Sequence, residues 1–159
     1  MDRDATARIR DEARGAGVNK RTGLNHPPRP VKDAVIERDG HFCLLALNRC
    51  QGEATTTDHR ANRQAGGSRL LNHPGVLVAA CERCNGDKAD AHAIVLFELE
   101  QRGLYVRPAA THAKTLERAL STPVQDLAGD WWMLLSSRER RPATDAEIAR
   151  HLEWVGEMR

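Results

Sequence analysis

The sequence predicts an α+β fold: a small core held by a metal ion, with a basic arm before it and helices after it. Three observations lead to this class. Four cysteines stand in two pairs far apart in the chain, short strand-like runs lie beside them, and helical patterns dominate the last third. The 159 residues, 40% hydrophobic and 29% charged, suit one globular domain with a small appendix and argue against a disordered chain.

We expect residues 1–30 to form a basic helix followed by an extended arm. Residues 5–14 have the composition of a short polar helix, and glycines and prolines interrupt the segment 15–31. Residues 1–32 carry eight Lys or Arg against four Asp or Glu, whereas the remainder carries 16 against 18. The arm could lie along a DNA backbone or be a solvated tail, and both alternatives stay open.

Residues 31–107 are expected to form the central domain. A helix over 31–38 is followed by the first cysteine pair and then by three threonines, a residue type that favours strands. Polar residues 60–75 predict a loop, and the apolar run 76–80 predicts a second strand that leads into the second cysteine pair. A single helix with a wide apolar face fits residues 85–102.

Residues 108–159 are predicted to form a helical extension that packs on the core. Residues 112–120 are amphipathic, and capping boxes at 122–125 and 144–147 each predict a helix start. The most apolar patch of the chain, Trp131 to Leu135, lies between them. No stretch is long enough to cross a bilayer and no secretory signal is seen, so we expect a cytoplasmic protein with no membrane partner.

The cysteines Cys43, Cys50, Cys81 and Cys84 predict a structural zinc site. In a reducing cytosol, paired thiols favour a metal over disulfides. The Cys81-x-x-Cys84 spacing lets a tight turn aim both sulfurs at one tetrahedral ion, whereas the first pair, with six residues between, is unusually wide. Zinc would clip two distant segments together, with an apparent affinity of about 10–16 kcal/mol in comparable peptides. Buried free thiols and a redox-active pair are the alternatives.

A string of polar residues suited to phosphodiester hydrolysis, with a glycine pair inside it, lies between and after the cysteine pairs. In chain order they are Asp58, His59, Arg60, Arg63, Gly66, Gly67, Asn85 and Lys88. This string resembles the HNH endonuclease family in its zinc-stabilised four-cysteine form, and it is similar to the short HNH proteins of actinobacteria and their phages. The resemblance covers about Arg38 to Asp90, one third of the chain.

The chemistry of these residue types is independent of the family name. Hydrolysis needs a base to take a proton from water and a cation on the phosphate. Histidine is the natural base near neutral pH, and oxygen ligands such as Asp58 suit Mg²⁺ or Mn²⁺. Neighbours on a strand point to opposite faces, so Asp58 and His59 converge on one phosphate only if the strand ends or twists there. Asn85, at a helix start, could complete the cation site.

The resemblance implies a treble-clef-like ββα-metal core, in which a β-hairpin and a helix surround one catalytic cation. It also implies roles for individual residues. His59 would be the general base, Asp58 and Asn85 the ligands of a catalytic Mg²⁺ or Mn²⁺, and Lys88, Arg60 and Arg63 contacts to DNA phosphates.

Two positions depart from the family pattern. The middle asparagine of the family usually lies five residues before the third cysteine, where this chain has Val76. Asn72, or less favourably Asn62, could replace it in tethering the loop that carries the base. The wide first cysteine pair is the second departure.

The sequence therefore predicts a metal-dependent DNA endonuclease that nicks or cuts. The alternative is a non-catalytic zinc-binding adaptor for nucleic acid or protein, in which the Asp58–His59 pair is incidental. A weaker third option is a thiol oxidoreductase. Taken singly, Asp58 could cap a turn, His59 could be a partly buried histidine and Asn85 an N-cap residue. Their joint presence beside the cysteines favours the active site.

Overall fold

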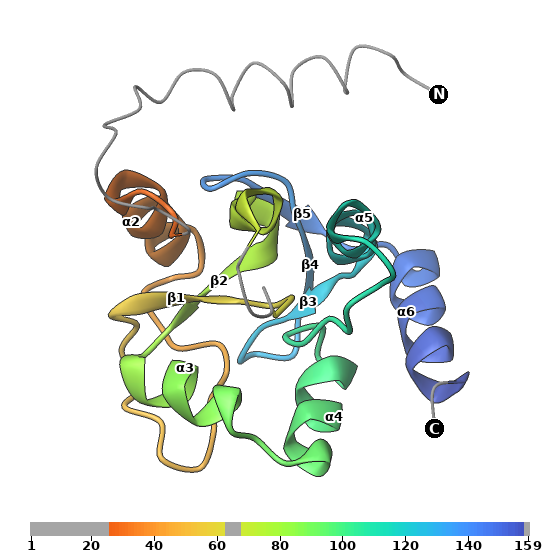
Figure 1. Ribbon diagram of the computed structural model, residues 1–159, viewed down its shortest axis with the longest axis horizontal. Coiled ribbons are helices and arrows are strands. Elements are labelled where there is room, and N and C mark those ends of the chain that lie inside the picture. Colours follow the sequence, from red (N-terminus) through yellow and green to blue (C-terminus); the bar gives the residue numbers. More distant parts are fainter. Residues whose placement is uncertain (1–25, 63–67, 158–159) are drawn as a thin grey trace.

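A two-stranded and a three-stranded antiparallel sheet organise the computed structural model, which describes residues 26–62 and 68–157 (Figure 1). Helices cover both sheets, so the α+β class is confirmed. The helix predicted over residues 5–14 and most of the predicted arm lie outside the described residues. Among the described helices, none combines the length and apolarity that a membrane span requires.

The first described helix, α2, spans Arg29–Arg38 and begins earlier than predicted. Pro30 lies in its first turn, where a missing backbone N–H costs nothing, so the end of the predicted extended arm is helical instead. Ala34 and Val35 are buried, and the helix packs against both strands of the smaller sheet. Gly40, with φ of +79°, turns the chain away from the helix toward the cysteine loop.

The smaller sheet pairs β1, Thr56–His59, with β2, Leu77–Ala80. Threonines in β1 suit a strand because β-branched side chains fit the pleated surface. All four residues of β2 are buried, and the register places His59 opposite Leu77 at the end of β1. His59 therefore lies where the strand ends, as a convergence with Asp58 requires.

The connection between these strands is more ordered than the predicted loop over 60–75. It contains two 3₁₀ turns, η1 at Arg69–Asn72 and η2 at Pro74–Val76. Leu71 is fully buried and fixes η1 to the protein. Its apolar cluster consists of Ala61, Leu71, Val76, Val106 and Ala119.

The single helix predicted over 85–102 is wrong, because the chain forms two helices there. They are α3, Glu82–Ala89, and α4, Ala93–Gln101. The apolar face that suggested one helix belongs to α4, whose Leu99 enters the core with Val95 packed beside it. The polar α3 starts at the second cysteine pair and follows its geometry, so the two helices take different directions (Figure 1).

The C-terminal part is not the purely helical extension that the sequence predicted. Its elements are α5 His112–Ser121, β3 Val124–Gln125, β4 Trp131–Leu134, β5 Arg140–Pro142 and α6 Asp145–Glu157. The helix start predicted at 122–125 is wrong, since these residues lead into a hairpin whose turn contains Gly129 at φ +92°. Asp126 caps that turn by accepting hydrogen bonds from the backbone of Ala128 and Asp130.

The capping box predicted at 144–147 is confirmed at the start of α6. Glu147 N donates to Thr144 Oγ1 at 3.3 Å, and Thr144 N donates to Glu147 Oε2 at 2.8 Å. The predicted helix over 112–120 is also confirmed, as α5. The C-terminal sheet shares the core with the cysteine region, because Val124 and Leu134 belong to the same apolar cluster as Cys43.

Candidate functional site

The four cysteines predicted to bind zinc lie together. One ligand atom from each of Cys43, Cys50, Cys81 and Cys84 lies within 4.8 Å of all the others. A tetrahedral zinc ion bound at about 2.3 Å would separate its sulfur ligands by about 3.8 Å, so a small inward movement completes the site. The donor set fits a structural zinc ion, and the predicted clustering of the two pairs is confirmed.

Tight backbone turns compensate for the wide spacing of the first cysteine pair. His41 and Ala46 adopt φ of +66° and +48°, the left-handed region that side chains other than glycine rarely enter. Cys50 N then donates to Leu47 O at 2.8 Å, which folds the intervening loop back on itself. The departure from the usual spacing is therefore absorbed by the loop and does not separate the sulfurs.

The environment of the sulfurs favours a bound cation. Burial raises the pKa of Cys43 and Cys84, whereas for Cys81 backbone and side-chain hydrogen bonds overcome burial and lower the pKa to about 7. Four clustered thiolates would repel one another without a positive ion. Cys50, the least buried of the four, is the one on the solvent side.

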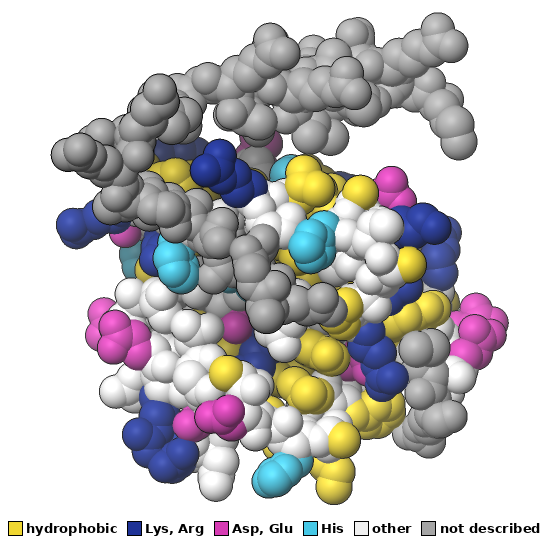
Figure 2. All heavy atoms as spheres, viewed as in Figure 1, with side chains coloured by type: hydrophobic (Ala, Val, Ile, Leu, Met, Phe, Trp, Pro, Cys, Tyr) yellow, Lys and Arg dark blue, Asp and Glu magenta, His cyan; other side chains and the backbone are white. Residues whose placement is uncertain are grey.

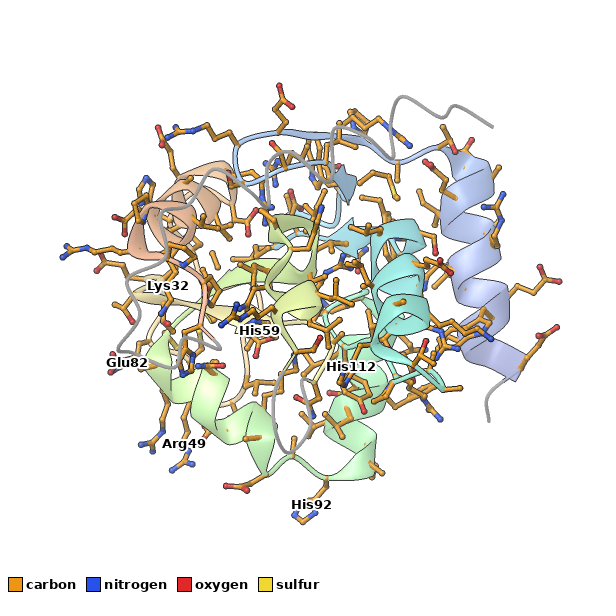
Figure 3. All side chains as sticks on the ribbon, turned by 45° about the horizontal axis from the view of Figure 1, so that its top comes forward. Lys32, Arg49, His59, Glu82, His92 and His112 are labelled. Atoms are coloured by element: carbon orange, nitrogen blue, oxygen red, sulfur yellow. The ribbon has the colours of Figure 1, made fainter. Side chains whose placement is uncertain are left out.

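His59 and Asn72 meet at the end of β1. The ring atom His59 Nε2 lies 2.9 Å from Asn72 Oδ1, and both side chains are partly buried. Asn72 was predicted as a tether for the loop, and the structure brings it into contact with the imidazole itself. Figure 3 shows His59 near the centre of the molecule, between α2 and α3. The less favoured candidate, Asn62, is exposed.

Lys88 is paired with Asp58, so its predicted role as a phosphate contact is wrong. Its ammonium donates to Asp58 Oδ2, to the backbone oxygen of His59 at 2.9 Å and to that of Leu104 at 3.1 Å. The Lys88 side chain is 2% exposed and that of Asp58 is 6% exposed. Burial raises the pKa of the Asp58 carboxyl, and the ammonium of Lys88 opposes this. No phosphate can reach the ammonium while this pair is intact.

Arg60 is also unavailable to a phosphate, and that prediction is wrong as well. The side chain has no exposed surface. Its guanidinium donates to four backbone oxygens at 2.5 to 3.0 Å, those of Gly75, Gly103, Ala119 and Thr122. Burial lowers the pKa of Arg60 to about 9. This arginine joins segments of the protein to one another.

Asn85 is a partly buried residue of α3. It precedes Lys88 by three residues, so both side chains project from the same helix face, and Lys88 reaches Asp58 from there. The second oxygen of Asp58, Oδ1, has no hydrogen-bond partner among the described residues. These two side chains suit Mg²⁺, which often takes one or two protein carboxylates and fills its shell with water and phosphate oxygens.

No second metal site of the cysteine kind exists in the described ranges. Within 26–62 and 68–157, the four cysteines form the one group of three or more His, Cys, Asp or Glu side chains that could hold an ion.

Arg63, predicted as a phosphate contact, lies outside the described residues. Arg69, which no sequence pattern singled out, lies on η1 with Asn72. The ordered 3₁₀ turn that positions it was hidden in a segment of loop-like composition.

Comparisons with known proteins identify no relative. No family model, curated protein or solved structure matches the chain.

Proposed function

We propose that the protein is a metal-dependent DNA endonuclease in which His59 is the general base. One observation carries this proposal: a partly buried histidine at a strand end is hydrogen-bonded to Asn72 at 2.9 Å, beside a helix that starts in a four-cysteine cluster. A general base needs a fixed orientation and access to a water molecule. The partial exposure of His59 and its contact with Asn72 are consistent with both needs.

The contact with Asn72 supports the protonation state that a base requires. The amide oxygen of Asn72 accepts hydrogen bonds but cannot donate them, so the imidazole of His59 carries its proton on Nε2. In the proposed reaction the imidazole of His59 takes a proton from water. Near neutral pH an imidazole is well suited to accept that proton.

A chain of contacts links the cysteine cluster to His59. The sulfur of Cys81 caps α3 by accepting from Cys84 N at 3.3 Å, so the position of the helix depends on the cluster. From the last turn of α3, Lys88 donates to the backbone oxygen of His59. Metal binding by the cysteines therefore stabilises the end of β1 as well as the helix.

Asp58 Oδ1 and Asn85 would hold the catalytic Mg²⁺ or Mn²⁺. When bound, this cation supplies positive charge to the scissile phosphate and to the leaving oxygen. The ion pair with Lys88 favours the charged form of Asp58 against the burial that raises its pKa, and it fixes the orientation of the carboxyl group. The same ammonium would lie close to a cation held by Asp58 and would weaken its affinity, so we expect the protein to need millimolar rather than trace concentrations of Mg²⁺.

The ion pair also favours a second candidate function. Because Lys88 already compensates the charge of Asp58, the carboxylate has a structural explanation that needs no cation. In that case the protein is a non-catalytic zinc-binding adaptor for nucleic acid or protein. The adaptor predicts DNA binding without cleavage in any divalent metal, and no effect of Asp58→Ala on that binding.

Relaxation of supercoiled plasmid separates the two candidates. Wild type is assayed over Mg²⁺, Mn²⁺, Ca²⁺ and Zn²⁺ beside His59→Ala and a matched control, His92→Ala. His92 is exposed and lies far from His59 in the view of Figure 3. We expect cleavage by wild type and His92→Ala with Mg²⁺ or Mn²⁺, and a loss of about 10²–10⁴-fold in His59→Ala. Undiminished cleavage by His59→Ala would remove His59 as the base.

A further inference from the structure

The spacing of a 3₁₀ helix assigns Arg69 and Asn72 to the same face of η1. A 3₁₀ helix has three residues per turn, so side chains three apart lie above one another. Arg69 is the first and Asn72 the last residue of η1, and Asn72 contacts His59. The geometry of this turn therefore directs Arg69 to the side of the protein on which His59 lies.

The turn that carries Arg69 is fixed in place. Leu71, at its centre, has no exposed surface, and Leu71 N donates to Ser68 O at 3.2 Å. After the turn, Gly75 N donates to His73 Nδ1 at 3.1 Å, which connects η1 to η2. The backbone of Arg69 is thus anchored, while its side chain is exposed.

Arg69 has no partner within the described part of the protein. Nearly all other described arginines donate to a carboxylate or to backbone oxygens, or lie over a tryptophan ring, as Arg140 does. Arg69 and Arg150 alone make none of these contacts with described residues. An exposed guanidinium without a carboxylate partner is suited to bind a phosphate through two parallel hydrogen bonds.

We propose that Arg69 binds a backbone phosphate of duplex DNA next to the phosphodiester held at His59. This inference rests on the proposed function for its choice of ligand. It gives Arg69 the role that the sequence had assigned to Arg60 and Lys88, both of which are buried. Figure 2 shows that charged side chains of both signs are spread over the described residues of the face in view. The position of a single arginine therefore matters for DNA binding.

The test is the salt dependence of DNA binding. A fluorescent duplex is titrated with protein carrying His59→Ala, so that no cleavage interferes, from about 50 mM to about 200 mM salt. Arg69→Gln is compared with Arg150→Gln. Arg150 is the other arginine that lacks a partner among the described residues, and it belongs to α6, at the opposite edge of the molecule from β1 (Figure 1). Thermal unfolding of each variant confirms that it is folded.

We expect Arg69→Gln to raise the Kd about tenfold, the effect of losing one solvent-exposed charged contact to a phosphate. The slope of log affinity against log salt should fall by about 0.9, the contribution of one phosphate contact. Arg150→Gln should change neither quantity. Arg69→Lys keeps the charge but loses the planar fork, so it should preserve the slope while weakening binding.

The outcomes separate this inference from the proposed function. Binding with an unchanged slope in Arg69→Gln overturns the role of Arg69 and leaves the endonuclease standing. If wild type binds DNA but does not cleave it in the presence of any divalent metal, the endonuclease is overturned. A reduced slope in Arg69→Gln would then still support the phosphate contact. Failure of wild type to bind DNA at about 50 mM salt overturns both.

Discussion

Replacing Lys88 by methionine should remove a large part of the free energy of unfolding of this protein. The ammonium satisfies three buried oxygens, namely Asp58 Oδ2 and the backbone oxygens of His59 and Leu104. Removing one partner of a buried ion pair costs about 3–5 kcal/mol. Each unsatisfied carbonyl adds about 1 kcal/mol. A domain of this size has about 5–15 kcal/mol in total, so Lys88→Met consumes much of it.

The cost should depend on pH in a defined direction. Burial raises the pKa of Asp58, and removal of the ammonium raises it further. A carboxyl whose pKa is higher in the folded than in the unfolded state contributes fully at pH below its unfolded value. That contribution is lost as the pH rises through the folded value. The deficit of Lys88→Met should therefore be smaller at about pH 5 than at about pH 8.

Urea denaturation of both proteins at the two pH values measures this difference. The double variant Lys88→Met/Asp58→Leu is the control, because replacing both partners of a buried pair by apolar side chains is often close to neutral. It should recover most of the lost stability. A loss below about 1 kcal/mol in Lys88→Met, or a deficit that does not vary with pH, would contradict the buried pair.

Two further predictions concern the cysteine cluster and the helix α6. Purified protein should contain one zinc ion for each chain, and a strong chelator or Cys50→Ser should abolish the cooperative thermal transition; an unchanged transition after chelation argues against the four-thiolate clip. Burial lowers the pKa of His151, so the stability it contributes is present above its ordinary value of 6.5 and is lost as the pH falls through the folded value. His151→Gln, which keeps a donor toward Gln101 O, should flatten the decline in the urea midpoint between about pH 7 and about pH 5, and an unchanged decline would exclude His151 as its source.

Local chemistry explains which parts of this fold were predictable. The cysteine pairs were found because metal-binding thiols have a recognisable spacing, and the helix at Thr144 because a capping box satisfies its own backbone donors. The pattern at 122–125 has the same appearance but leads to a strand. There the outcome was decided by pairing of Val124 with Trp132, a contact that no local pattern contains.

The errors at Arg60 and Lys88 have a different origin. Charged side chains are rarely buried, so an exposed role was the reasonable prediction for both. Their burial depends on acceptors supplied by distant segments, such as Thr122 for Arg60 and Leu104 for Lys88. A one-dimensional pattern carries no information about such acceptors until the fold is known. Arg69 was missed for a different reason: the residues around it have the composition of a loop, and no local pattern indicates the ordered turn η1.

The carbonyl contacts of Arg60 also limit how this protein can be dissected. Two of its acceptors, Gly75 and Gly103, belong to the central segment, whereas Ala119 and Thr122 come from the C-terminal part. A fragment that ends at residue 107 would retain the guanidinium of Arg60 but lose two of the four oxygens that accept its hydrogen bonds. Arg60 directly follows His59 in the chain, so this loss would fall next to the histidine. Grafting His59 and the four cysteines onto another scaffold would therefore transfer these side chains without the hydrogen bonds of Arg60 that hold the surrounding segments in place.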